Sequence, residues 1–457
     1  MKFYLFITIF MSVLNGFSQN WNQKLTFTGK EAEDEYGWSV SCSGDYVVIG
    51  AYEEDIDGYK DAGACYIYKN TNETWEFQQK IEAEEKRSSA RFGFAVDIDS
   101  NQIIIGAWGE DAAYIFENIN QNWTQKQRIT YNDTASPGKW FGFSASLAKN
   151  YAIIGAYYDY VDENGENELG WSGSAYIFKK EYGQWNQLKK IVASDRQGSQ
   201  WYGRAVSMNK DYAVVGTLGK GVYIYKNLSD SWTEILKIDS IGIGESLNLN
   251  NNNLIAGIPE RKIVYIFNAD SGEWEIKSIL KASDPANNVN FGSSVAIKDS
   301  LAIIGADGSY KAYLFSFLND NWVEVGTYSA DNGSGSSEFG HSVDISSSCI
   351  VIGDYKFETN RGKAYIYYDQ NILNIIQHKQ NLFNIFPNPA SNFIKLEYKL
   401  SKGELNIYDI SGQLVKKHRI TESKKIPINN LKDGLYLIEI NTGEGVSQRS
   451  KLVVKTK

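Results

Sequence analysis

The sequence predicts an all-β protein, a seven-bladed β-propeller closed by an N-terminal strand and followed by a small C-terminal β-sandwich. The first observation is an aromatic residue, once isoleucine, followed by glycine, which recurs seven times. The second is another glycine that follows each first glycine at a constant offset of 13. The pairs are Gly37 and Gly50, Gly93 and Gly106, Gly142 and Gly155, Gly203 and Gly216, Gly244 and Gly257, Gly292 and Gly305, and Gly340 and Gly353. Successive first glycines lie 41 to 61 residues apart, which is typical of one four-stranded blade.

The third observation is a spare strand at the N-terminus. Each repeat continues with an apolar strand rich in aromatics, and in six repeats a tryptophan follows the first tyrosine of that strand at an offset of 9. The seventh repeat has Asn374 at this position, whereas an unmatched tryptophan strand, residues 21–27, precedes the first repeat. A ring leaves no free sheet edge only if its two ends meet. The sequence therefore predicts that residues 21–27 form the outer strand of the seventh blade.

The N-terminus and the charge distribution predict an exported, modular chain. Residues 1–18 combine Lys2, an apolar stretch and a small-residue end, as a secretory signal peptide does, so the mature chain is expected to begin at Gln19 without a transmembrane segment. Residues 376–457 carry 14 Lys and Arg against 7 Asp and Glu, whereas residues 1–375 carry 32 against 48. An acidic propeller repels phosphate backbones, so nucleic acid is not an expected partner.

The tail has its own pattern. After a linker at residues 376–381, residues 382–457 contain a Pro-Asn-Pro entry, alternating apolar strands, Gly turns and a basic last strand. Residues 382–457 resemble the C-terminal sorting domain of type IX secretion substrates. The resemblance implies that the type IX machinery is a partner and that the protein is secreted or held on the outer-membrane surface.

The preceding part, residues 19–375, resembles FG-GAP repeat proteins, which include the integrin alpha-subunit propeller. Phe92-Gly93 and Phe291-Gly292 are examples of the FG element, and Gly106-Ala107 is an example of the GA element. In that family an Asp-rich loop between FG and GA often holds calcium. The constant offset of 13 leaves only tight hairpins here, so those calcium sites are not expected.

One face of the propeller is predicted to carry the function. Antiparallel strands place the FG-to-GA hairpins on one face and the long loops and blade connectors on the other. We call the second face the long-loop face. It should carry six aromatic residues that either bind a glycan or protein or pack blade against blade. These candidate ligand-binding residues are Tyr52, Trp108, Trp140, Tyr157, Trp201 and Tyr355.

The first long loop is a candidate calcium site. Its acidic residues alternate along the chain, with a glycine at the sixth place, as a calcium loop requires for its sharp turn. The candidate ligands are Glu53, Asp55, Asp57 and Asp61. The alternative is an acidic, solvated loop.

Catalytic signals are poor. The three histidines, His341, His378 and His418, are scattered, and no Ser-His-Asp unit is visible. The sequence therefore predicts an extracellular or surface-attached binding or adhesion protein rather than an enzyme. The alternative is a polysaccharide-acting hydrolase or lyase on a propeller scaffold.

Overall fold

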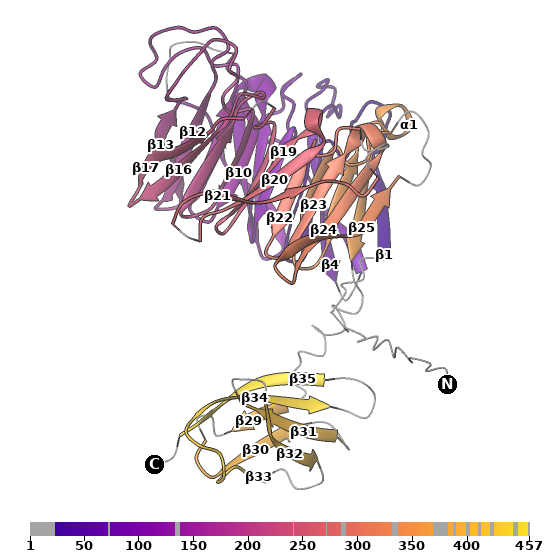
Figure 1. Ribbon diagram of the computed structural model, residues 1–457. Helices are drawn as coiled ribbons and strands as arrows, with labels where there is room; N and C mark the ends of the chain where they lie inside the picture. The colour runs from indigo at the N-terminus through magenta and orange to yellow at the C-terminus, as the bar shows by residue number, and fades with distance from the viewer. Residues whose placement is uncertain are drawn as a thin grey trace, which may run out of the picture. The chain divides into compact units, whose positions relative to one another are not determined.

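A computed structural model of the chain describes two compact units, which lie within Met1–Asp369 and Gln370–Lys457 (Figure 1). The described residues are 23–71, 74–132, 138–240, 242–270, 272–284, 289–330, 337–368, 383–386, 390–398, 403–409, 413–420, 425–441 and 447–455. The predicted signal peptide, Trp21 and the predicted linker lie outside the described residues. Among the described residues, no helix is long and apolar enough to cross a membrane.

The first unit is a propeller of seven four-stranded antiparallel sheets, which confirms the predicted fold. Blades 1 to 3 contain β2 (Val40–Ser43), β3 (Tyr46–Ala51), β4 (Ala64–Thr71), β5 (Thr74–Ile81), β6 (Ala95–Asp99), β7 (Gln102–Ala107), β8 (Ala112–Ile119), β9 (Asn122–Ile129), β10 (Phe141–Ala148), β11 (Tyr151–Ala156), β12 (Ser174–Glu181) and β13 (Gln184–Ile191). Blades 4 to 6 contain β14 (Ala205–Met208), β15 (Tyr212–Gly216), β16 (Val222–Leu228), β17 (Ser231–Ile238), β18 (Ser246–Asn250), β19 (Asn253–Ile258), β20 (Ile263–Asn268), β21 (Glu275–Leu280), β22 (Val295–Lys298), β23 (Leu301–Ala306), β24 (Lys311–Leu318) and β25 (Asn321–Ser329).

The N-terminal strand completes the seventh blade, as predicted. Its sheet has the order β1-β28-β27-β26 and contains β1 (Gln23–Thr28), β26 (Ser342–Ile345), β27 (Ile350–Asp354) and β28 (Lys363–Tyr368). β1 pairs antiparallel with β28 from Gln23 opposite Tyr368 to Thr28 opposite Lys363. The ring of Phe27 also lies 3.9 Å from the ring of Tyr68 in blade 1. The strand therefore joins the last blade to the first.

The paired glycines have two separate causes. Each first glycine has a φ between +90° and +118°, a conformation that favours glycine. Each second glycine lies against the next blade. A Cβ atom on Gly50 would lie 2.1 Å from the carbonyl oxygen of Gly93, and one on Gly353 would lie 1.9 Å from that of Gly37. The repeat motif thus marks the places where neighbouring blades touch through their backbones.

The outer strands are joined by the repeated tryptophans. Trp123 in β9 is 2% exposed, and its ring meets the ring of Tyr46 in the preceding blade edge to face at 5.4 Å. The side chain of Gln79 in β5 accepts from the backbone N–H of Trp123 at 2.9 Å and donates to its carbonyl oxygen at 2.8 Å. Gln127 and Trp185 repeat this pair of bonds between blades 2 and 3. The tryptophans therefore pack blade against blade.

The inner strands are joined by a ring of side-chain hydrogen bonds. At six of the seven blade junctions, the residue four places after the first glycine accepts a hydrogen bond from a backbone N–H of the next blade. In order, Asp344 accepts from Cys42, Ser41 from Ile98, Asp97 from Leu147, Ser146 from Met208, Ser207 from Leu249 and Asn248 from Ile297, at 2.7 to 3.3 Å. The remaining repeat has Ala296 at this position. Six of the seven blade junctions are thus held by a side-chain hydrogen bond close to the ring axis.

The second unit is built from two sheets, as the predicted sandwich requires (Figure 1). They contain β29 (Phe383–Phe386), β30 (Phe393–Tyr398), β31 (Gly403–Tyr408), β32 (Leu414–Ile420), β33 (Lys425–Pro427), β34 (Gly434–Asn441) and β35 (Ser447–Val454), ordered β29-β30-β33 and β32-β31-β34-β35. Ile394 and Ile426 from one sheet share a buried core with Leu405, Ile438 and Leu452 from the other. The unit thus has its own hydrophobic core.

Candidate binding site

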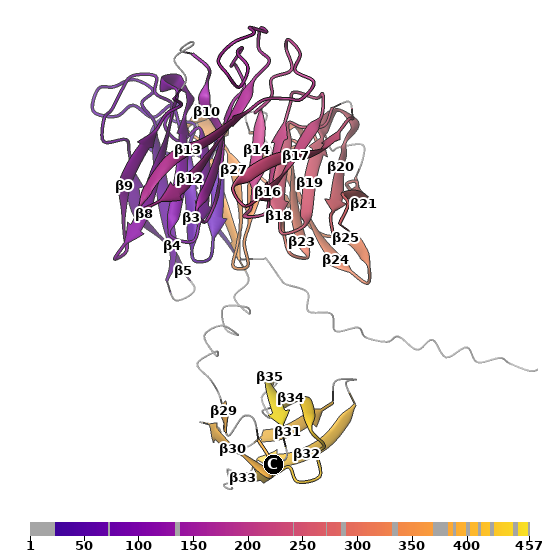
Figure 2. The same cartoon turned by 90° about the vertical axis from the view of Figure 1, so that its left-hand side faces the viewer.

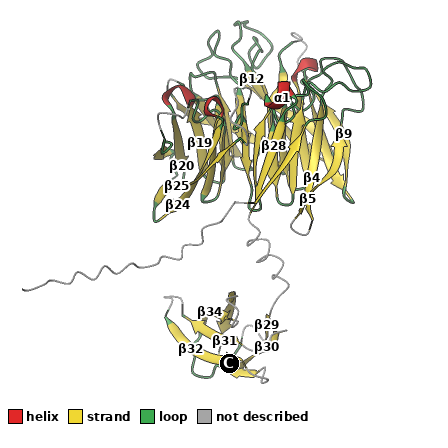
Figure 3. Cartoon of the chain, turned by 90° about the vertical axis from the view of Figure 1, so that its right-hand side faces the viewer, coloured by secondary structure: helices red, strands yellow, loops and turns green. Residues whose placement is uncertain are grey.

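The long loops and blade connectors gather at one end of the propeller, where Figure 2 shows them at the top of the view. The longest loops that join the second strand to the third span residues 52–63 in blade 1 and residues 157–173 in blade 3. The corresponding connections in blades 2, 5 and 6 are the short 3-10 turns η1 (Trp108–Glu110), η2 (Pro259–Arg261) and η3 (Asp307–Ser309), and blade 7 carries the short turn α1 (Phe357–Asn360), which Figure 3 shows in red. Loop length on this face therefore differs from blade to blade, whereas the opposite face carries tight hairpins.

Aromatic rings from four consecutive blades form one connected cluster on the long-loop face. Trp38 of blade 1 lies 4.5 Å from His341 of blade 7 and 5.1 Å from Phe94 of blade 2, measured between ring centroids. Phe94 lies 4.7 Å from Phe143 of blade 3. Trp38, Phe94, Phe143 and His341 each follow the first glycine of a repeat, at the start of an inner strand. The cluster therefore lies close to the ring axis.

Five of the six predicted aromatic residues belong to this cluster. Trp140 contacts Trp108 at 4.5 Å and Tyr157 at 5.3 Å between ring centroids. Tyr52 and Tyr355 contact Trp38, each at 4.8 Å. We call the whole cluster the aromatic mouth. It consists of Trp38, Tyr52, Phe94, Trp108, Trp140, Phe143, Tyr157, Tyr158, Trp171, His341 and Tyr355.

The six predicted residues differ in exposure. Tyr52 and Tyr355 are only 8% and 9% exposed, so they mainly support the rings above them. Trp108, Trp140 and Tyr157 are partly exposed. Trp201 is also partly exposed, but among the described residues it makes no ring contact with the aromatic mouth. Burial therefore assigns two of the predicted residues to packing and leaves four with accessible surface.

Sequence reasoning missed the three rings nearest the axis. Trp38, Phe94 and Phe143 directly follow the glycines that marked the repeat. In blades 4 to 6 the same position holds Arg204, Glu245 and Ser293. This position is therefore aromatic on one side of the ring and polar on the other, and a sequence comparison of the repeats at this one position could have shown it.

The polar residues of blades 4 to 6 lie next to the aromatic mouth. The guanidinium of Arg204 lies 4.9 Å from the ring centre of Phe143, within range of a cation-π contact. Burial raises the pKa of Glu245, and the positive charge of Arg204 partly offsets this effect. The site thus combines flat apolar rings with charged hydrogen-bonding groups, a combination that suits ligands with both apolar and polar faces.

The acidic residues of the first long loop do not converge on one point. Arg91 pairs with Glu53 and, at 3.4 Å, with Asp61, whereas Lys86 pairs with Asp57 at 2.8 Å. Asp55 accepts the backbone N–H of Asp61 at 2.8 Å. A calcium ion in this loop would have to compete with two basic side chains. Calcium binding at Glu53, Asp55, Asp57 and Asp61 stays a prediction.

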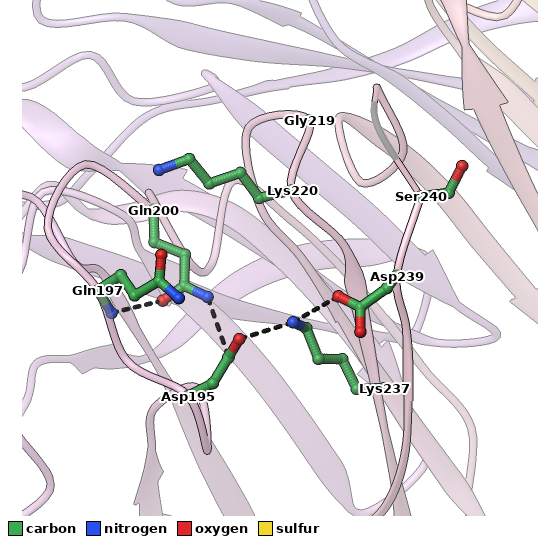
Figure 4. A pocket seen from close by; sticks show the side chains of 8 residues that line it. All are labelled: Asp195, Gln197, Gln200, Gly219, Lys220, Lys237, Asp239 and Ser240. Atoms are coloured by element: carbon green, nitrogen blue, oxygen red, sulfur yellow. Dashed lines mark hydrogen bonds and ion pairs between the residues drawn. The ribbon is translucent and has the colours of Figure 1, made fainter.

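A separate polar pocket of about 370 Å³ lies between connectors of blades 3 to 5 (Figure 4). Its centre is Asp195, which accepts from Lys237 at 2.6 Å and from Gln200 at 3.2 Å. Lys237 also pairs with Asp239 at 2.5 Å. The charged groups at the centre of this pocket thus satisfy one another.

The hairpin face has a cavity of about 420 Å³ where the inner strands end. Asp97 and Asp344 lie in its wall, and the Ser41 hydroxyl lies within 3.3 Å of a carboxylate oxygen of each. Burial, together with the negative charge of Asp344, raises the pKa of Asp97 to about 7 against the opposing effect of the hydrogen bond from Leu147. Two acids near one hydroxyl therefore favour protonation in the folded state.

Asp97→Asn should stabilise the propeller at pH 8. The folded state holds a proton that the unfolded chain releases between about pH 4 and 7, so wild-type stability falls as pH rises through this window. The amide introduced by Asp97→Asn would not titrate and could still accept from Leu147. We expect a gain of about 1 to 2 kcal/mol at pH 8, after allowance for the water that reaches the partly exposed Asp97, and the gain should shrink toward pH 4. Urea unfolding at pH 4.5, 6 and 8 measures it. A variant less stable than wild type at pH 8 would contradict the assignment.

Comparison with known proteins identifies both units. Residues 384–455 match the secretion system C-terminal sorting domain. FG-GAP repeats match at residues 21–68, 75–116, 123–178, 185–225, 274–315 and 322–367, which together make up more than half of the chain. The fifth repeat, which has Ile243 in place of the aromatic residue and Ile258 in place of the alanine, is not among these matches.

The remaining comparisons add little. No curated protein matches the chain. Among solved structures, the crystal structure of Sqt1 from Saccharomyces cerevisiae is similar, with 9% identity and a TM-score of 0.44 over 94% of this chain and 98% of that chain. The sorting domain indicates export by type IX secretion to the cell surface or the medium, and the chain belongs to the FG-GAP repeat family.

Proposed function

We propose that this exported propeller is an extracellular binding or adhesion protein that takes up a glycan at the aromatic mouth. The connected rings of blades 7, 1, 2 and 3 carry the proposal, because they offer flat apolar surface beside polar groups. A sugar has the matching features, an apolar ring face and a rim of hydroxyl groups. Stacking on rigid aromatic rings costs little conformational entropy.

The backbone conformation at two of the aromatic residues is shared with other blades. Trp140 and Trp201 have φ values of +55° and +50°, a region that bulky side chains rarely occupy. The equivalent residues also have positive φ in blades 1, 2, 5 and 6, where they are Glu35 (+51°), Arg91 (+63°), Gly242 (+89°) and Asn290 (+63°). Tryptophan at such positions costs conformational energy. Because the conformation recurs around the ring, this cost belongs to the repeat and is not specific to Trp140 and Trp201.

Trp108→Ala should weaken glycan binding about tenfold or more. Trp108 is partly exposed and lies against Trp140, and a central aromatic contact typically contributes on the order of 1 to 3 kcal/mol. A glycan array with the mature protein identifies the ligand, and calorimetry with that glycan measures the loss. Lys149→Ala, in the hairpin between β10 and β11 on the opposite face, is the matched control and should leave the affinity unchanged.

Three outcomes would contradict the proposal. One is loss of binding in Lys149→Ala while Trp108→Ala keeps its affinity. Another is an array without hits together with a protein ligand, which would replace the glycan by a protein. Turnover of a polysaccharide by the mature protein would favour the enzymatic alternative.

A further inference from the structure

Three potential metal ligands converge at the polar edge of the aromatic mouth. They are Asp307, the first residue of η3 in blade 6, and Glu338 and His341 in the connector that leads to β26 of blade 7. Their ligand atoms all lie within 4.8 Å of one another. Among the described residues, no other group of three His, Cys, Asp or Glu side chains meets this condition.

In each of the two carboxylates, one oxygen lies near Nδ1 of His341, and the other oxygen is held by hydrogen bonds or an ion pair to other residues. Oδ2 of Asp307 lies 3.6 Å from Nδ1 of His341, and Oε2 of Glu338 lies 3.9 Å from the same nitrogen. Oδ1 of Asp307 accepts from Asn290 at 3.1 Å and from the backbone N–H of Gly308 at 2.7 Å. Such outer contacts orient metal ligands in known sites.

Glu338 and His341 are fixed in the same way. Oε1 of Glu338 pairs with Lys356, which leaves Oε2 facing His341. The imidazole lies between two rings, 4.5 Å from Trp38 and 4.7 Å from Tyr355. The backbone N–H of His341 donates to the carbonyl oxygen of Glu338 at 3.0 Å, which sets the spacing of the two side chains.

The site is recessed but reachable. The side chain of Asp307 is 12% exposed and that of His341 is 26% exposed. An ion could therefore reach the three ligands from solvent.

We propose that Asp307, Glu338 and His341 form a binding site for one zinc ion. An imidazole nitrogen with two carboxylates suits zinc and similar first-row ions, whereas calcium takes oxygen ligands alone. Three protein ligands leave one coordination position open for water or another ligand. The proposal does not rest on glycan binding, since the ion can bind without a glycan.

Zinc titration of the mature full-length protein, made metal-free by dialysis against a chelator, tests the site. We expect one equivalent bound by calorimetry, and visible absorption bands when Co²⁺ replaces zinc. His341→Gln should abolish the bands and weaken zinc at least tenfold, and Asp307→Asn and Glu338→Gln should each weaken it as well. His418→Gln, in β32 of the sorting domain, is the matched control and should bind as the wild type does.

Thermal melting of each variant separates loss of a ligand from loss of the fold. An anomalous diffraction peak at the zinc edge in wild-type crystals gives a second measurement that needs no variant. A peak between Asp307, Glu338 and His341 supports the proposal. Saturable zinc binding that survives His341→Gln, a peak elsewhere, or no saturable binding would overturn it, and in the last case His341 is simply a packed neighbour of the two acids.

Discussion

Removal of residues 19–27 should destabilise the propeller and expose an open sheet edge. β1 forms the outer strand of blade 7 through six paired residues, and Phe27 packs on Tyr68 of blade 1. At roughly 1 kcal/mol for each backbone hydrogen bond, the loss should be on the order of 5 kcal/mol. The edge of β28 would then be free to pair with another chain. Thermal unfolding and size-exclusion chromatography of the truncated protein measure both effects.

The matched control begins at Gln19 and keeps the strand. A synthetic peptide covering residues 19–28 should restore part of the lost stability, because an added strand can complete an exposed edge. A truncated protein that melts at the wild-type temperature and stays monomeric would show that β1 does not close the ring.

Gly106→Ala should have a comparable effect from a single methyl group. A Cβ atom on Gly106 would lie 1.9 Å from the carbonyl oxygen of Gly142 in the next blade, so the two backbones would have to separate. We expect a loss at the upper end of the range for overpacked sites, about 3 kcal/mol. Gly170→Ala is the control, because a Cβ there meets nothing within 4 Å. Urea unfolding compares the two variants, and equal stabilities would mean that blade contacts do not explain the repeated glycine.

The blade pattern could be predicted from the sequence because the backbone contact between blades requires glycine at one position of every repeat. Gly50 and its equivalents must be glycine in every blade, so they repeat. The N-terminal strand was predictable for a related reason, since a closed ring needs a full set of strands in every blade and the seventh repeat lacks its outer strand. By contrast, the hydrogen bonds between inner strands use Ser, Asp or Asn at one position and are hidden by this variety.

The candidate site was only partly predictable. Tyr52, Trp108 and Tyr157 could be found because they follow the GA position of their repeats. Trp38 and Phe94 follow the first glycine, but that position turns polar in blades 4 to 6 and therefore shows no period.

The ion-pair and hydrogen-bond partners were even harder to predict from the sequence. Arg91 lies 38 residues after Glu53 and meets it only through the fold. Asp307 and His341 come from different blades, and the spacing of two residues along the chain does not show that they are neighbours in space.

A crystal structure of the propeller with the glycan selected by the array would show where the glycan binds. We expect a sugar ring stacked on partly exposed rings of the aromatic mouth, such as Trp108, Trp140 or Phe143, with hydroxyl groups directed toward Arg204 or Glu245. A glycan bound at the hairpin face, or on the outer strands away from the ring axis, would contradict it.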